Sequence, residues 1–292
     1  MALNSRSGNF PLLFYGSSLR FEINHSHNLT HLEMRYSDLM KIKHVMVVAG
    51  FVVLAGVFAA SVSSVKQKGI LVVGIDPQFA PFESSNEKQE VVGFDADIAR
   101  ALAGKLGVKI EFKRLAIETL TSKAVPSNSV DMAISGIAIG KKPGVVFSDS
   151  YFSSAPVLVV RKGNPKKLTY PAASFKGVNL GVQANTTSFD AADQYLKPLG
   201  AQIKAYNDLA SSLVDLKAAA IDAIITDAPI ADYLVKTQNL ERTGKPLKLE
   251  EYGMAFKKGS DLVSAANDLI KTMKSDGRYQ KLLETWLINP AR

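Results

Sequence analysis

The chain has 292 residues, of which 47% are hydrophobic, and it carries a formal charge of +8. This length is enough for about two domains with cores of their own. There is no cysteine, which excludes disulfides, thiolate metal sites and a cysteine nucleophile. The basic residues are dispersed, and the tightest groups are pairs such as Lys141–Lys142. Dispersed lysines are typical of a solvated surface, so we expect no nucleic-acid partner.

The N-terminal region has the layout of an export signal. A basic stretch, Lys41–His44, precedes the uncharged apolar run Val45–Ala60, and small residues follow. This order is typical of a signal peptide, and the run is shorter than the roughly twenty residues that span a membrane. We predict a signal peptide at 40–64 that starts at Met40, with 1–39 as a non-native or disordered extension. The alternative is a natural extension with an uncleaved membrane anchor.

A strand and helix pattern begins after the predicted signal peptide. Ile70–Val73 is a short apolar run between glycines, which predicts a buried strand. Pro77 and Pro81 prevent its continuation, so Asp76 and Phe79 follow the C-terminal end of the strand. In open α/β sheets this is the edge at which ligands bind. Strands are also predicted at 108–112 and 130–134, and helices at 96–106 and 117–124.

The pattern restarts about midway along the chain. After a predicted loop at 147–152, strands are expected at 157–160, 177–182, 203–206, 221–225 and 252–256. Helices are expected at 188–196, 209–219, 262–274 and 279–287, and a further one opens with Asp227 near its cap and Pro229 in its first turn. Two blocks of similar size indicate two α/β units, and the terminal helices need a sheet on which to pack.

Several kinds of site are excluded or disfavoured by what the sequence lacks. All four histidines lie in the N-terminal segment, at His25, His27, His31 and His44. A Ser-His-Asp triad and histidine metal sites are therefore not expected after it. The stretch GIAIGKKPG lacks the Lys-Ser/Thr end of a phosphate loop. We expect no cofactor and no metal.

Eight stretches resemble a known family in their order and spacing. They are GIDPQFAPFE, VGFDADIARALAGKLGV, VDMAISGIAI, FSDSYFSSAPVLVVRKGNP, LGVQANTT, DAIITDAP, YGMAFKKGS and DGRYQKLLETW. The sequence resembles the periplasmic solute-binding proteins of amino-acid ABC transporters, which are the family-3 extracellular binding proteins. The resemblance covers about Gly69 to Leu287.

The resemblance implies an α/β, two-lobed periplasmic-binding-protein-like fold of type II. Each lobe is a mixed sheet flanked by helices, and two hinge strands join the lobes. Lobe 1 would comprise 69–156 plus 253–292, and lobe 2 would be 157–252. The implied protein is periplasmic, is not an enzyme, traps a small solute by hinge closure, and delivers it to an inner-membrane ABC permease. The sequence gives no sign of oligomerisation, so we expect a monomer.

The same resemblance implies where the solute binds. On lobe 1, Asp76 would meet an ammonium group or side chain, Phe79 would stack, and the strand end at Ser135 and Gly136 would offer backbone groups. On lobe 2, Asp227 would pair with the α-ammonium group. The turn after Val182 would contribute Gln183, Asn185, Thr186 and Thr187.

One departure from the family pattern concerns the carboxylate clamp. The family usually has a threonine two residues after the glycine and then an arginine, whose fork grips the α-carboxylate. Here Ala138 stands at the threonine position, and Lys141 and Lys142 replace the arginine without its fork geometry. Ile117 stands where a second stacking aromatic is common, and Asn185 stands where glycine is usual.

Three hypotheses follow from this departure. In the first, Lys141 or Lys142 takes over the carboxylate and the solute is still an amino acid. In the second, two acids without an arginine favour a cationic amine or guanidinium compound, with Phe79 in cation–π contact. In the third, the cleft is catalytic, as in the cyclohexadienyl and arogenate dehydratases of the same fold, with Glu118 as the candidate acid.

Overall fold

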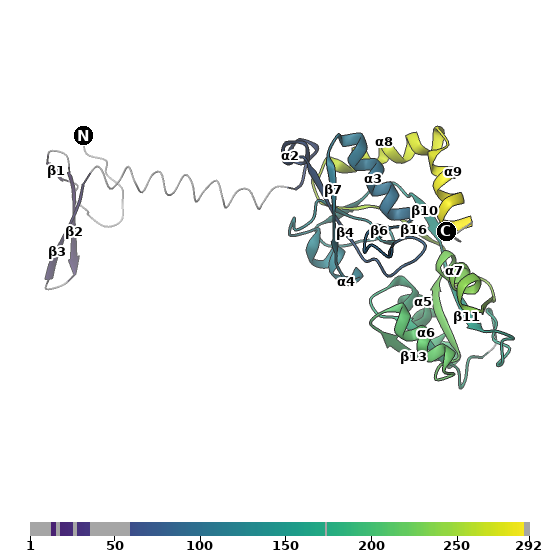
Figure 1. The fold of residues 1–292 in the computed structure, drawn as a ribbon. Helices are drawn as coiled ribbons and strands as arrows, with labels where there is room; N and C mark the ends of the chain where they lie inside the picture. The colour runs from purple at the N-terminus through teal and green to yellow at the C-terminus, as the bar shows by residue number, and fades with distance from the viewer. Residues whose placement is uncertain (1–12, 16–17, 26–27, 36–58, 173, 289–292) are drawn as a thin grey trace. The chain divides into compact units, whose positions relative to one another are not determined.

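The structure is a computed structural model that describes residues 13–15, 18–25, 28–35, 59–172 and 174–288 (Figure 1). It divides into two units, Met1–Phe58 and Ala59–Arg292. In the first, β1 (Leu13–Tyr15), β2 (Ser18–His25) and β3 (Asn28–Arg35) form an antiparallel sheet in the order β1-β2-β3. These strands were not foreseen, although SLRFEINH alternates as a strand does. That 1–39 are an extension stays a prediction.

Most of the predicted signal peptide lies outside the described residues. Its end overlaps α2 (Val62–Lys68), which belongs to the second unit and buries Val65 completely. Among the described residues, no helix has the length and apolar character needed to cross a membrane.

The first lobe of the second unit contains a five-stranded mixed sheet. Its order is β7-β4-β8-β17-β9, with β4 parallel to both β7 and β8. The strands are β4 (Ile70–Ile75), β7 (Lys109–Arg114), β8 (Met132–Ala133), β9 (Val145–Phe147) and β17 (Ala255–Lys257). Because β17 comes from near the end of the chain and pairs with β8 and β9, this lobe is discontinuous in sequence.

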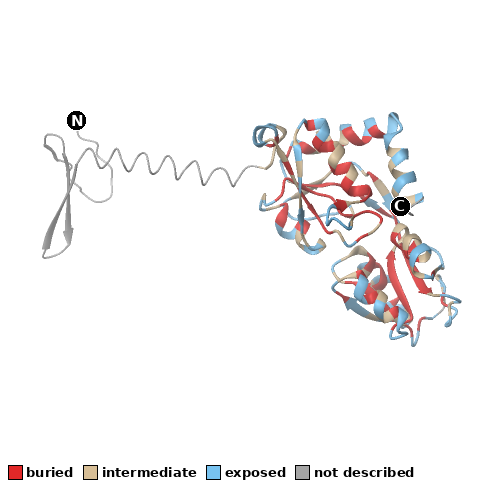
Figure 2. Cartoon of the chain, viewed as in Figure 1, coloured by how far each residue is buried: buried red, intermediate tan, exposed pale blue. Residues whose placement is uncertain are grey.

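Helices from both ends of the sequence belong to this lobe. They are α2, α3 (Phe94–Leu106), α4 (Ile117–Thr119), η1 (Leu120–Ala124), α8 (Leu262–Ser275), α9 (Arg278–Leu283) and η3 (Glu284–Ile288); a short pair, β5 (Ser84–Ser85) and β6 (Val91–Val92), completes it. Helix α3 buries Ile98, Leu102 and Leu106 at helical spacing, and Gly107 ends it in a left-handed conformation with φ 71°. The predicted C-terminal helices therefore pack on a sheet, as expected (Figure 2).

The second lobe contains another five-stranded mixed sheet, in the order β13-β12-β14-β11-β15. Its strands are β11 (Pro156–Arg161), β12 (Asn179–Gln183), β13 (Gln202–Tyr206), β14 (Ala223–Asp227) and β15 (Leu240–Thr243). Its helices are α5 (Thr187–Tyr195), η2 (Lys197–Leu199), α6 (Leu209–Lys217) and α7 (Ala228–Gln238). Strand β12 is parallel to β13 and β14, whereas β11 runs antiparallel to β14 and β15. The central strands β11 and β14 are almost entirely buried (Figure 2).

A two-stranded antiparallel pair connects the lobes in sequence. It consists of β10 (Phe152–Ser154) and β16 (Glu250–Tyr252), with Phe152 opposite Tyr252. The single strand predicted at 252–256 is wrong, because β16 and β17 belong to different sheets. The chain changes sheet at Gly253, where a Cβ atom would lie 2.8 Å from Ile139. The two-lobed fold with hinge strands is as predicted, while the boundaries 156/157 and 252/253 stay a prediction.

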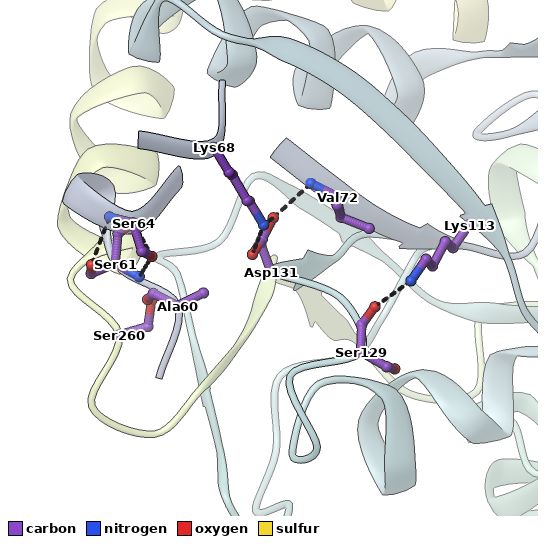
Figure 3. Close-up of polar contacts among 9 residues, drawn as sticks. All are labelled: Ala60, Ser61, Ser64, Lys68, Val72, Lys113, Ser129, Asp131 and Ser260. Carbon is purple, nitrogen blue, oxygen red and sulfur yellow. Dashed lines mark hydrogen bonds and ion pairs between the residues drawn. The ribbon is translucent and has the colours of Figure 1, made fainter. Parts of the chain in front are cut away.

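Polar contacts tie α2 to the first lobe (Figure 3). Ser61 caps the helix and forms a reciprocal capping box with Ser64. Both oxygens of Asp131 lie 2.6 Å from Lys68 Nζ, and one of them also accepts a 2.7 Å hydrogen bond from the Val72 backbone. The hydroxyl of Ser260 donates to the carbonyl of Ala60. The segment from Ala60 onward is therefore part of the folded lobe.

Candidate functional site

A cavity of about 370 Å³ lies between the two lobes, within the size range of small-molecule sites. Lobe 1 contributes Phe79, Ile117, Glu118, Thr121, Ser122, Gly136, Ile137, Ala138, Lys142 and Pro143, and lobe 2 contributes Asn185, Thr186, Thr187, Asp190 and Asp227. Eight of the twelve predicted binding residues are among them: Phe79, Gly136, Ala138, Lys142, Asn185, Thr186, Thr187 and Asp227.

Asp227 is the acid of the second lobe at the cavity. It ends β14 and occupies the N-cap position of α7, but its side chain makes no capping hydrogen bond. Pro229 at the second helical position has no N–H to offer. Ser188 Oγ lies 3.4 Å from Asp227 Oδ1. Burial raises the pKa of Asp227 to about 6, against the effect of the Tyr252 and Ser188 hydroxyls. The carboxyl group is therefore not used in capping.

The turn before α5 forms the rest of the second-lobe wall. Asn185 adopts a left-handed conformation with φ 60°, which asparagine tolerates better than most residues, so it can replace the usual glycine. Thr186 is the N-cap, and its Oγ1 accepts a 3.2 Å hydrogen bond from Phe189 N. Thr187 Oγ1 instead donates to Glu250 Oε2 at 2.6 Å. Gln183 does not line the cavity; its Nε2 donates to Asn207 O at 3.3 Å.

Asp76 does not line the cavity and instead supports its wall. Its Oδ2 accepts a 3.0 Å hydrogen bond from Ile117 N, the first residue of α4. Its Oδ1 accepts a 3.3 Å bond from Gln78 Nε2. Burial raises the pKa of Asp76, and these two hydrogen bonds oppose the rise. The carboxylate thus fixes the segment that carries Ile117 and Glu118 against the cavity.

The strand end after β8 provides backbone and a lysine. Gly136 and Ala138 line the cavity, while Ser135 lies completely buried behind them. Ser135 Oγ accepts from Asp76 N at 3.1 Å and donates to Glu83 Oε1 at 2.6 Å. Of the two candidate lysines, Lys142 lines the cavity and Lys141 does not.

The acids that line the cavity outnumber the bases. Glu118, Asp190 and Asp227 face one lysine, Lys142. Asp190, in the first turn of α5, was not predicted. The other unpredicted lining residues, Thr121, Ser122, Ile137 and Pro143, are brought to the cavity by tertiary packing. In the part of the chain that the structure describes, no group of three acids, histidines or cysteines could hold a metal.

The comparison with known families bears on this arrangement directly. The model of the bacterial extracellular solute-binding proteins, family 3, matches residues 71–289. The chain belongs to this family. The resemblance predicted from the sequence stretches is therefore confirmed.

Named relatives bind different amino acids. The L-cystine-binding protein TcyJ of Escherichia coli K12 is 32% identical over 253 residues, covering 85% of this chain and 94% of the relative. The arginine-binding periplasmic protein of Mannheimia haemolytica is 29% identical, covering 74% and 90%. A solved ancestral amino acid-binding protein, a precursor of cyclohexadienyl dehydratase, has a TM-score of 0.70 and 32% identity, covering 77% and 99%. The two relatives are thus both named as binding proteins.

Proposed function

We propose that this protein binds an amino acid in the interlobe cavity and delivers it to an ABC transporter permease of the inner membrane. The observation that carries the proposal is the Asp227 carboxyl group, which faces the cavity without a capping bond. An α-ammonium group would form a charge-assisted hydrogen bond with this carboxylate and would offset the free-energy cost of burying its charge. The ammonium group of Lys142 is the candidate for the α-carboxylate, because Gly136 N already donates to Asp95 Oδ2.

The charge of the cavity favours a solute with a cationic side chain. Glu118 and Asp190 line it in addition to Asp227, against Lys142 alone. Phe79 lines the same cavity and can add a cation–π contact. The arginine-binding relative supports this preference. The same excess of acids makes a cationic amine without a carboxylate the second candidate.

The function is a binding cycle and not a reaction. The open form would hold the solute on the first lobe, through Phe79 and the Gly136 strand end. Closure about β10 and β16 would bring Thr187 and Asp227 across it. The solute shifts the open–closed balance only by its differential affinity for the two forms. The protein works in this cycle as a periplasmic monomer, released by cleavage of its signal peptide.

A thermal-shift screen tests the proposal. The panel is the amino acids, polyamines, guanidinium compounds and prephenate. A solute at one hundred times its dissociation constant stabilises the protein by about 2.7 kcal/mol, which is a visible shift. We expect the largest shift with a cationic amino acid. A shift with amines alone would favour the second candidate, and turnover of prephenate without any amino-acid shift would overturn the proposal in favour of an enzyme.

A further inference from the structure

Two carboxyl groups lie together in the interior of the first lobe, behind the cavity wall. Glu83 and Asp95 are both completely buried. The segments that carry them are in contact, because Asp95 N donates a 2.9 Å hydrogen bond to Phe82 O. The contact is so close that a Cβ atom at Gly93 would lie 2.2 Å from Phe82 O. Neither acid was among the residues predicted to bind the solute.

Each acid uses one oxygen to hold the strand end at the cavity. Glu83 Oε1 accepts a 2.6 Å hydrogen bond from Ser135 Oγ. Asp95 Oδ2 accepts bonds of 2.8 Å from Gly136 N and from the Tyr151 hydroxyl. The two acids therefore grip two consecutive residues, of which Gly136 lines the cavity.

The other oxygen of each acid is not reached by any donor outside the pair. Glu83 Oε2 and Asp95 Oδ1 are buried and accept no hydrogen bond as long as both groups are carboxylates. A buried carboxylate oxygen without a donor costs free energy. Two such oxygens on adjoining acids can satisfy each other only if one carboxyl group is protonated and donates to the other.

The surroundings supply no cation to neutralise two negative charges. The titratable groups that act on the pair are Asp76 beside the strand end, Tyr151 just before β10, and Tyr279 of α9. No lysine or arginine among the described residues forms an ion pair with either acid. Two buried like charges in contact cannot both persist without such a partner.

We propose that Glu83 and Asp95 hold one proton between Glu83 Oε2 and Asp95 Oδ1, and that this hydrogen-bonded pair is a positioning element for Ser135 and Gly136 at the cavity. Glu83 donates and Asp95 accepts. This assignment leaves Asp95 ionised, so that it can accept from both Gly136 N and the Tyr151 hydroxyl. It also leaves Glu83 Oε1 free to accept from Ser135 Oγ.

The acid–base properties of the pair agree with this geometry. Burial, the charge of Asp95 and the hydrogen bond to Asp95 hold the pKa of Glu83 well above its usual range. Burial also raises the pKa of Asp95, to about 7, while Gly136 N, Tyr151 and Glu83 oppose the rise by hydrogen bonding. These raised pKa values make the stability of the protein depend on pH. The folded protein keeps a proton that the unfolded chain has lost, so stability falls as pH rises through the raised pKa of the pair.

The proton itself is tested without any solute. Between pH 7.5 and 9, the unfolding equilibrium constant of the protein in urea should rise by up to about tenfold per pH unit, because one proton is released on unfolding. Glu83→Gln should remove this slope, since an amide donates to Asp95 permanently. Glu87→Gln, at an exposed glutamate, should keep it. An equal slope in natural protein and Glu83→Gln, or no slope in the natural protein, would overturn the proposal.

A double-mutant cycle gives a second test of the shared proton. In Glu83→Gln or Asp95→Asn alone, one amide still faces one carboxylate. In the double variant two amides meet, so it should be less stable than the sum of the single effects. Additive effects would contradict the shared proton. If the double variant does not fold, the slopes of the single variants still decide the question.

The positioning effect rests on the proposed function and is measured separately, with L-arginine as the probe. Glu83→Leu should weaken L-arginine binding at least tenfold, and Glu83→Gln should recover most of the loss. Equal affinity for L-arginine in Glu83→Leu and in the natural protein would mean that the pair does not position Ser135 and Gly136 for binding. If natural protein binds no L-arginine, the proposed function fails in its cationic form, while the pH slope still tests the proton.

Discussion

Thr187 Oγ1 lies 2.6 Å from Glu250 Oε2 and donates a hydrogen bond to it. Thr187 begins α5 and lines the cavity, whereas Glu250 begins β16, the strand that pairs with β10 between the lobes. Burial raises the pKa of Glu250 to about 6, and the Thr187 hydroxyl opposes this rise. One hydrogen bond thus joins the second-lobe binding turn to a hinge strand.

Removal of this hydroxyl should destabilise the protein. Thr187→Val leaves a mostly buried carboxylate oxygen without its donor, which costs about 1–3 kcal/mol. Urea unfolding at pH 7.5 measures the change. Thr285→Val is the matched control, because that exposed hydroxyl donates only to Lys281 O, four residues earlier in the chain. We expect the control to change stability by less than about 0.5 kcal/mol. Equal losses in both variants would contradict the importance of the Thr187–Glu250 bond.

Binding of a cationic amino acid should depend on the ionisation of Asp227. Because burial raises the pKa of this residue to about 6, most of its carboxyl groups are neutral at pH 5. A neutral carboxyl group is a poor partner for an ammonium group, so affinity should fall about tenfold per pH unit below pH 6. Calorimetric titration at pH 5, 6 and 7.5 measures it.

The stability of the unliganded protein should have the opposite pH dependence and should fall as pH rises. An acid with a raised pKa stabilises the fold fully below its usual pKa, and this contribution is lost as pH rises through the raised value. For Asp227 and Glu250 the loss falls between about pH 4 and pH 6.

An affinity for the cationic amino acid that stays constant from pH 5 to 7.5 would argue against ionised Asp227 as the ammonium partner.

Asp227→Ala should weaken binding of any amine-bearing solute more than tenfold. The variant removes the buried charge at the cavity, and a bond to a charged group contributes about 1.5–3 kcal/mol. Asp232→Ala is the control on the same helix, where the carboxylate pairs with Arg242 at the surface. Unchanged affinity in Asp227→Ala, measured by calorimetry, would exclude the ammonium contact.

The longer helices and the central strands of the two lobes were predictable because local patterns determine them, whereas the short strands β9, β10 and β15 were not predicted. The stripe of Ile98, Leu102 and Leu106 and the stop at Gly107 suffice for α3. The division of 250–257 into β16 and β17 was not predictable in this way. Both strands are short, and the chain passes from one sheet to the other at Gly253, where a Cβ atom would lie too close to Ile139, which is distant in sequence. Tertiary contacts therefore decided what the apolar run could not.

The binding wall shows the same division. Phe79, Gly136 and Asp227 were identified through the family resemblance, and all three lie at or just after strand ends, where ligand sites gather. Asp76 follows a strand end too, but Ile117 N and Gln78 occupy its carboxylate. The position of Asp76 in the sequence predicted the edge of the sheet at which it lies, but not the direction in which its side chain points. Asp190 was missed for the converse reason, since only the packing of α5 brings it to the cavity.

Lys142 and Lys141 should differ in their effect on binding although they are neighbours. Only Lys142 lines the cavity, so Lys142→Met should weaken binding of L-arginine by about twofold to fivefold, as expected for an exposed ion pair. Binding of agmatine, which lacks the carboxylate, should not weaken. Lys141→Met should leave both affinities within about twofold. Equal effects of the two substitutions on L-arginine would mean that neither lysine replaces the missing arginine.

The N-terminal helix of the lobe should contribute measurably to its stability (Figure 3). A chain that begins at Gly69 lacks the fully buried Val65, whose burial contributes about 1.5–3 kcal/mol. It also leaves Asp131, which is only 8% exposed, without Lys68. We therefore expect a chain that begins at Ala60, which keeps Ser61 as the helix cap, to be at least about 2 kcal/mol more stable than one that begins at Gly69. Urea unfolding of the two chains measures the difference. Equal midpoints would mean that α2 adds nothing to the stability of the lobe. Cleavage of the predicted signal peptide at any bond up to residue 68 would then have no effect on the fold.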